Sequence, residues 1–130
     1  MSIFKPSRLA LAALLSGSTL ALMACGPVIP RGDIESAKKA MDLAVECKTD
    51  EAVAASQRAS QSGGLGGALG DAERVVILRE AGRNSQADAA RAAYLSKAGA
   101  SAAAELDKST ALGVEQIRVD RAKRSGKRSC

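Results

Sequence analysis

The sequence predicts an all-α fold of small, alanine-rich helical hairpins, in which two stacked helix pairs are followed by a long C-terminal helix. Alanine, the strongest helix former, is the commonest residue, and apolar residues recur at helical spacing along the chain. The 130 residues include one Phe, one Tyr and no Trp. Such small side chains bury little apolar area per residue, so modest stability is expected, and disorder is the main alternative to a fold.

The beginning of the chain has the pattern of a signal peptide. Lys5 and Arg8 supply a positive start, and residues 9–22 form an apolar run that small and polar residues interrupt at 16–19. A membrane-spanning helix needs about 20 predominantly apolar residues, so this run is too short and too broken to be one. A charged start followed by a short apolar run predicts export.

The apolar run ends in Leu22-Met23-Ala24-Cys25, which resembles the lipobox of bacterial lipoproteins. The resemblance implies that residues 1–24 are a signal peptide that is cleaved and that Cys25 carries two or three acyl chains, palmitate among them. Two or more chains hold a protein stably on a bilayer. Gly26 in place of an inner-membrane retention Asp implies the outer membrane, facing the periplasm. The alternative is an ordinary secretory signal with a chance cysteine.

Residues 25–32 are predicted to be a lipidated tether, because two prolines and two glycines prevent a helix there. A helical domain is predicted over residues 33–124. Its first helix runs to about Cys47 and its second from Thr49 or Asp50 to about residue 60, each with one apolar stripe.

The glycine-rich stretch 63–70 lacks the spacing of nucleotide-binding loops, and we interpret it as a flexible connection. Asp71 is expected to cap a third helix over 72–81, whose apolar run Val75-Val76-Ile77-Leu78 is the predicted centre of the core. Gly82 is placed to end this helix.

A fourth helix is predicted to begin at Asn84 or Ser85, with Gly99 breaking or bending it. A fifth covers about residues 101–124. Residues 125–130 are predicted to be the flexible end of a basic tail.

A period of 35 residues relates the first two helix pairs, and both units consist of a helix, a polar turn and a second helix. In the second turn, Gly82 lies five residues before Ala87, which resembles the inter-helix turn of tetratricopeptide repeats. Cys47 occupies the glycine position in the first unit, and the family's aromatic anchors and closing proline are absent. The resemblance implies two stacked helical hairpins, although a plain three- or four-helix bundle fits the same pattern.

Cys47 and Cys130 are candidates for a disulfide, because a lipidated Cys25 leaves an even pair of thiols in an oxidising compartment. The bridge would close a loop of roughly 84 residues and contribute on the order of 4 kcal/mol in the loop-entropy account. Two free thiols, or pairing between chains through Cys130, are the alternatives.

The net charge of +5 is concentrated at the C-terminus, where residues 118–130 carry six basic residues against one acidic residue. This segment is either a solvated tail or a binding surface for anionic lipid or lipopolysaccharide. Nucleic acid is not expected as a partner, since no aromatic residues interleave for base stacking. The candidate surface residues are Arg118, Arg121, Lys123, Arg124, Lys127 and Arg128.

The composition argues against catalysis. The chain has no His, and its carboxylates mostly lie three or four residues from a Lys or Arg, so no oriented acid, base and nucleophile is visible. We therefore expect no enzyme activity, no metal and no cofactor. The sequence predicts a membrane-anchored, periplasm-facing lipoprotein that serves as a helical interaction or scaffold subunit of a cell-envelope system, with a protein partner. The alternative is an electrostatic binder of anionic lipid or lipopolysaccharide.

Overall fold

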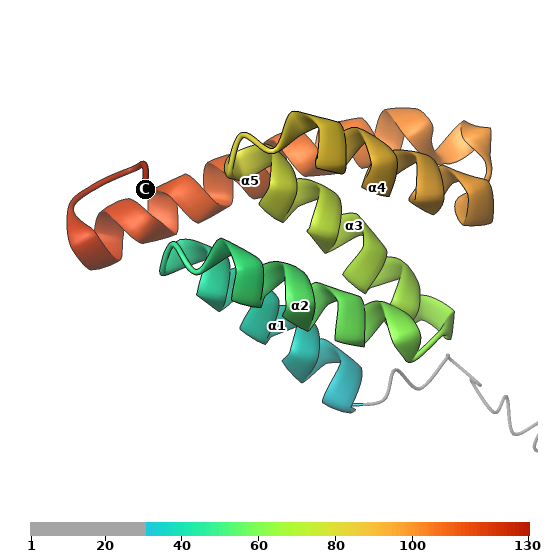
Figure 1. The fold of residues 1–130 in the computed structure, drawn as a ribbon, viewed down its shortest axis with the longest axis horizontal. Coiled ribbons are helices and arrows are strands. Elements are labelled where there is room, and N and C mark those ends of the chain that lie inside the picture. The colour runs from blue at the N-terminus through green and yellow to red at the C-terminus, as the bar shows by residue number, and fades with distance from the viewer. Residues whose placement is uncertain (1–30) are drawn as a thin grey trace, which may run out of the picture.

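The computed structural model describes residues 31–130, and within them it contains helices and no strand (Figure 1). This confirms the predicted all-α class. The expected signal peptide, Cys25 and the greater part of the expected tether lie outside the described residues. The helices are α1 (Arg31–Val45), α2 (Thr49–Gln61), α3 (Gly64–Glu80), α4 (Asn84–Ala98), the short 3₁₀ helix η1 (Ala100–Ala102) and α5 (Ala103–Ser125).

Helix α3 is the centre of the fold, because it contacts α1, α2, α4 and α5. It runs diagonally between the α1–α2 pair on one side and α4 with the first part of α5 on the other (Figure 1). Val76 and Ile77 pack with alanines of α1 and α2 and with Ile117 of α5, whereas Val75 and Leu78 pack with Ala87 and Ala90 of α4. The apolar run of α3 is entirely buried, as predicted for the centre of the core.

The turns of the two hairpins repeat each other with the predicted period of 35 residues. Cys47 and Gly82 both adopt a positive φ, 64° and 72°, and each lies two residues after the end of its helix, α1 or α3. In each turn this residue donates its N–H to the carbonyl three residues back at 3.1 Å, and the next residue (Lys48 or Arg83) donates to the carbonyl five residues back at 2.9 Å. These are the two bonds of the Schellman motif, which satisfies the last carbonyls of a helix.

The glycine-rich stretch is helical, so its interpretation as a flexible connection is wrong. Residues 64–70 form the first two turns of α3, which pack tightly on the end of α2. A Cβ on Gly70 would lie 2.6 Å from the backbone N of Ser60 and 2.8 Å from the carbonyl oxygen of Ser56. Glycine is required here because the two backbones approach too closely for any side chain, and this packing offsets the low helix propensity of glycine.

Replacing Gly70 by alanine is therefore expected to destabilise the protein by about 2 kcal/mol, although alanine is ordinarily the better helix former. The exposed Ala68 provides a control on the same helix, since Ala68→Gly should cost only about 1 kcal/mol through helix propensity. Urea unfolding measures both. A Gly70→Ala protein more stable than the wild type would contradict the close approach of α2 and α3.

Asp71 is not the cap of a helix but a buried residue inside α3. Its carboxylate accepts hydrogen bonds from Arg74 at 3.2 Å and from Lys97 of α4 at 2.8 Å. The prediction that it caps the helix is wrong because the helix begins seven residues earlier, at Gly64. Gly99, with a φ of 90°, ends α4 rather than bending it.

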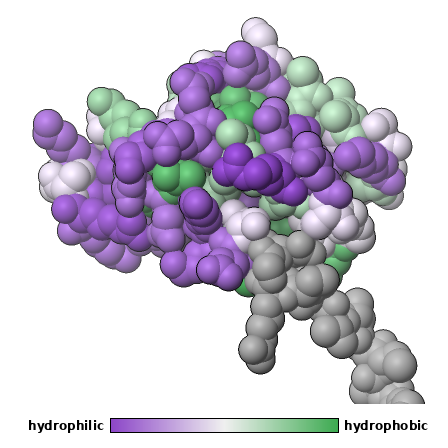
Figure 2. Space-filling model, turned by 60° about the horizontal axis from the view of Figure 1, so that its bottom comes forward, coloured by the Kyte–Doolittle hydropathy of each residue, from purple (hydrophilic) through white to green (hydrophobic). Residues whose placement is uncertain are grey.

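The surface differs between the two ends of the body. Hydrophilic residues cover most of the left part of the face in Figure 2, which is the side of the C-terminus in Figure 1. Paler and green residues are more frequent toward the right.

Candidate functional site

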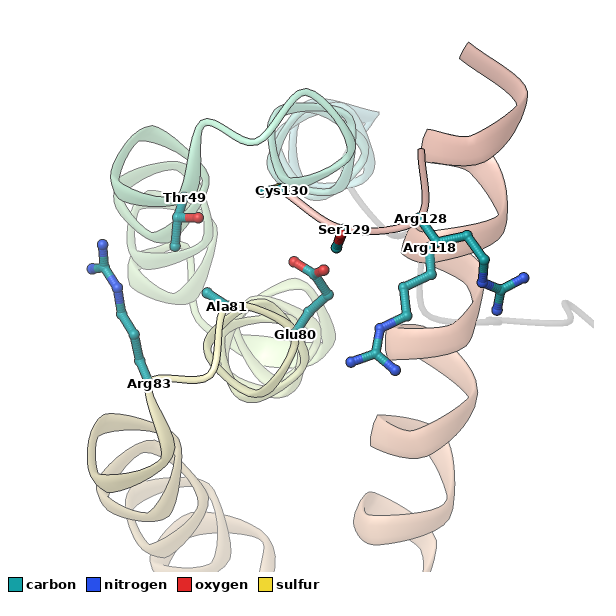
Figure 3. Close-up of a pocket in the computed structure, with 8 residues that line it drawn as sticks. All are labelled: Thr49, Glu80, Ala81, Arg83, Arg118, Arg128, Ser129 and Cys130. Carbon is teal, nitrogen blue, oxygen red and sulfur yellow. The ribbon is translucent and has the colours of Figure 1, made fainter. Parts of the chain in front are cut away.

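The C-terminal segment folds back after α5 and ends beside the α1–α2 turn, where it forms one wall of a pocket (Figure 3). The pocket has a volume of about 500 Å³. Arg83 lies on one side of it and the two arginines Arg118 and Arg128 on the other, with Glu80 between them. The pocket is lined by Thr49, Glu80, Ala81, Arg83, Arg118, Arg128, Ser129 and Cys130.

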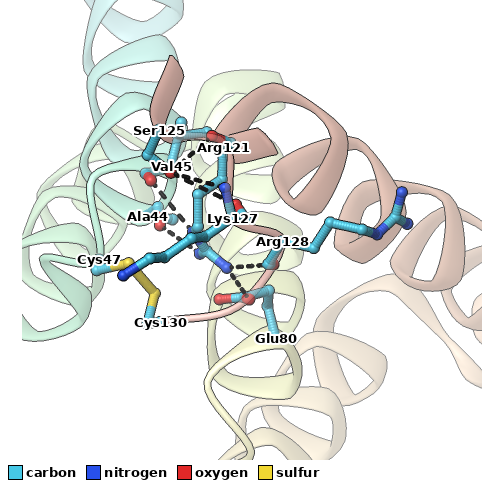
Figure 4. Close-up of a disulfide and its surroundings, with 9 residues drawn as sticks. All are labelled: Ala44, Val45, Cys47, Glu80, Arg121, Ser125, Lys127, Arg128 and Cys130. Atoms are coloured by element: carbon cyan, nitrogen blue, oxygen red, sulfur yellow. Dashed lines mark hydrogen bonds and ion pairs between the residues drawn. A yellow bond between two sulfur atoms is a disulfide. The ribbon is translucent and has the colours of Figure 1, made fainter. Parts of the chain in front are cut away.

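A disulfide between Cys47 and Cys130 fixes this segment to the turn after α1 (Figure 4). The Sγ–Sγ distance is 2.12 Å and the Cα–Cα distance is 5.6 Å. Of the alternatives that the sequence leaves open, the structure contains the intramolecular bridge. Both cysteines are exposed. We call this end of the body, which holds the bridge and the pocket, the disulfide end.

The largest fully buried side chain is that of Arg121 in α5, which has a relative exposure of 2%. Its guanidinium donates to the carbonyl of Ala44 at 2.8 Å and to that of Val45 at 3.2 Å (Figure 4). Both carbonyls belong to the last turn of α1, where backbone acceptors lack partners within the helix and carry partial negative charge. Arg121 therefore caps α1 although it lies more than seventy residues further along the chain.

The same guanidinium forms a buried ion pair with Glu80, at the end of α3. Arg121 Nη1 donates to Glu80 Oε1 at 2.6 Å and to the carbonyl of Arg128 at 3.0 Å. Neither side chain of the pair is more than 7% exposed. One side chain thus joins α1, α3, α5 and the C-terminal segment, and it leaves no excess charge buried at this end.

Two predictions about the C-terminus are wrong for this reason. Arg121 is not a surface residue and cannot contact a lipid or lipopolysaccharide surface, because α1 and α3 enclose it. Residues 125–130 are not a loose tail, since Gly126 ends α5 in the left-handed conformation and the bridge and the Arg128 carbonyl hold the segment.

Of the other five predicted surface residues, three form ion pairs on the protein itself. Lys123 pairs with Asp120 at 3.1 Å, Arg124 with Asp42 at 2.7 Å, and Arg128 with Glu115. Hydrogen bonds from Lys38 and then Arg124 lower the pKa of Asp42 below its ordinary value. Arg118 and Lys127 are exposed and form no ion pair with a described residue. All of these residues lie toward the C-terminal end of α1, away from where the chain enters the body.

Glu73 in α3 was not singled out from the sequence, although it lies seven residues before Glu80 on the same stripe of the helix. Its Oε2 atom is buried and has no hydrogen-bond partner among the described residues. Burial raises the pKa of Glu73 to about 7 from an ordinary value of 4.5. The carboxyl group is therefore partly protonated near neutral pH.

Glu73 is expected to make the protein less stable as the pH rises. The unfolded chain releases this proton near pH 4.5 and the folded chain near pH 7. The stability that the protonated Glu73 preserves is therefore fully present below about pH 4.5 and is lost as the pH rises to about 7. A fully buried group shifted this far would cost about 3 kcal/mol, and partial solvent exposure reduces this to roughly 1–2 kcal/mol.

Glu73→Gln should consequently be more stable than the wild type at pH 8 by this amount and nearly equal to it at pH 5. Urea unfolding at the two pH values measures the difference. Glu105→Gln, which changes an exposed carboxylate in the first turn of α5, serves as the control and should lower stability by less than about 1 kcal/mol at both pH values. Equal effects of the two substitutions at pH 8 would contradict the role of burial.

Comparison with known proteins adds no family to this description: no protein-family model, curated protein or solved structure matches the chain. None of the helices over residues 31–130 combines the length and the apolar character needed to cross a bilayer. Within the same residues no group of three or more His, Cys, Asp or Glu is placed to hold a metal ion.

Proposed function

We propose that the protein is a lipid-anchored subunit of a bacterial cell-envelope system, and that its helical body serves protein–protein interaction in the periplasm. The observation that carries this proposal is the sequence Leu22-Met23-Ala24-Cys25 at the end of a short apolar run. The disulfide between two exposed cysteines supports it, because such bridges persist in oxidising compartments outside the cytoplasm.

The geometry of the body favours the disulfide end as the surface for a partner. Helix α1 starts where the anchored chain enters and extends about 22 Å to the turn that carries Cys47. The pocket and the exposed cations Arg118 and Lys127 lie at that distant end. A partner with an acidic surface would find charge complementarity there, at a place that the anchoring bilayer does not cover.

Mass spectrometry of the mature N-terminus tests the anchor. We expect the chain to begin at an acylated Cys25 and to sediment with membranes, and we expect Cys25→Ser to be neither acylated nor cleaved at this position. An unmodified Cys25, or a different mature N-terminus, would refute the proposal.

The interaction role is tested by introducing a photo-crosslinking residue at Arg118 in intact cells. Leu112, an exposed residue in the middle of α5, is the control position. We expect a defined adduct from position 118 that disappears in the Cys25→Ser background, and none from position 112. A protein recovered without a partner from both positions would contradict an interaction role for the disulfide end.

A further inference from the structure

Several large apolar side chains are exposed at the end of the body where α1 begins, and they contribute little to the core. Ile34 is 49% exposed, Leu65 57% and Leu69 43%. They are three of the four large hydrophobic residues that are exposed in the described part of the chain. The stretch 61–70, which contains two of them, has no charged residue at all. We call the surface defined by Ile34, Leu65 and Leu69 the N-terminal end.

The topology brings these residues to the same end. A tight turn joins α1 to α2, so the start of α1 lies beside the last turn of α2. A second tight turn, at Ser62 and Gly63, places the first turns of α3 next to it. Figure 1 shows the start of α1 and the α2–α3 turn together at the lower right, opposite the C-terminus.

The residues around this surface suit the boundary of a bilayer. Tyr94, the only aromatic residue of the described chain, and Lys97 line a pocket of about 280 Å³ with Gly63, Gly64 and Ala68. Tyrosine is enriched where head groups meet acyl chains, because its ring is apolar and its hydroxyl group is polar. Arg58, near the end of α2, is an exposed cation that anionic head groups would attract.

The position of the predicted anchor selects the bilayer among possible occupants. Cys25 and Arg31 are separated by only six residue steps, which span at most roughly 20 Å when fully extended. An acylated Cys25 would therefore hold the N-terminal end within this distance of the membrane. The opposite, disulfide end would point away from the membrane, because α1 runs from one end to the other.

We infer that the N-terminal end rests on the bilayer, with Ile34, Leu65 and Leu69 inserted at the boundary of head groups and acyl chains, and that this contact fixes the orientation of the body. The inference rests on the proposed lipid anchor. Contact at a fixed surface removes much of the rotational freedom that a lipid anchor alone would leave. It keeps the disulfide end directed toward the periplasmic space.

The test uses the full acylated protein in vesicles of phosphatidylethanolamine and phosphatidylglycerol. An environment-sensitive fluorophore is attached to Leu65→Cys, or to Leu112→Cys as the matched control, since the native Cys47 and Cys130 are bonded to each other. Leu112 is 65% exposed and lies in the middle of α5. We expect blue-shifted emission that brominated acyl chains quench at position 65, and neither effect at position 112.

Each outcome separates the inference from the anchor. Protein that fails to sediment with the vesicles refutes the lipid anchor itself. Protein that sediments but shows the same aqueous emission at both positions refutes the orientation alone. Blue-shifted emission at position 65 that brominated lipid does not quench would assign the surface to a second copy of the chain, which also refutes bilayer contact.

Discussion

Replacing Arg121 by methionine is expected to lower the free energy of unfolding by about 3–5 kcal/mol, the cost of breaking a buried ion pair from one side. The substitution leaves the carboxylate of Glu80 buried without its cation, and it leaves the carbonyls of Ala44 and Val45 without their donor. Methionine fills much of the same volume, so a cavity contributes little to this loss. Urea unfolding followed by circular dichroism measures the effect.

Arg124 provides a matched control, since it is an arginine three residues further along α5 that pairs with Asp42 on the surface. Arg124→Met should cost no more than about 1 kcal/mol, the range of exposed ion pairs. The double variant Arg121→Met/Glu80→Gln should recover part of the loss, because the unpaired buried charge is then absent. Similar effects of the two arginine substitutions would show that burial of Arg121 does not govern its contribution.

Opening the Cys47–Cys130 disulfide is expected to lower the free energy of unfolding by about 4 kcal/mol, because the bridge closes a long loop and so restricts the unfolded chain. The loss also has a local part. The C-terminal segment supplies the carbonyl of Arg128 to Arg121, and this segment has no other covalent attachment to α1. The measurement is urea unfolding of the wild type with and without reductant.

Two variants separate the bridge from the turn that carries it. Cys130→Ser removes only the bridge, whereas Cys47→Gly also relieves the positive φ of Cys47 and matches Gly82 in the second turn. Both should be less stable than the oxidised wild type and insensitive to reductant, and Cys47→Gly should be the more stable of the two by about 1 kcal/mol. An unchanged midpoint in the reduced wild type would contradict a stabilising bridge.

The helices and the 35-residue period could be predicted because their signals are local. Apolar spacing, glycines such as Gly82 and Gly99, and the buried run from Val75 to Leu78 act within a few residues of the chain. The observed helix ends agree with these expectations within one or two residues for α2 and α4.

The errors concern residues whose environment depends on distant parts of the chain. From the sequence alone, Gly67 and Gly70 indicate a flexible linker, but in the fold they pack against α2. In the same way, the sequence places Arg121 in a basic tail, but in the fold its side chain binds the end of α1. The burial of Glu73 could not be predicted from the sequence, because it depends on neighbouring helices; only its place on an apolar stripe pointed to it. The sequence cannot distinguish these buried residues from solvent-exposed ones, because their burial depends on contacts between different helices.

The bridge also has a mechanical consequence. Bonding Cys47 to Cys130 makes a covalent ring that contains α2 to α5 and leaves α1 as the only described helix outside it. A pulling force that enters ahead of Arg31 can draw out α1 and its turn, residues 31–46, before it reaches the ring. The extension then stops, and Arg121 has lost the carbonyls of Ala44 and Val45. Under tension, α1 serves as the extensible part of the protein while the ring keeps α2 to α5 together.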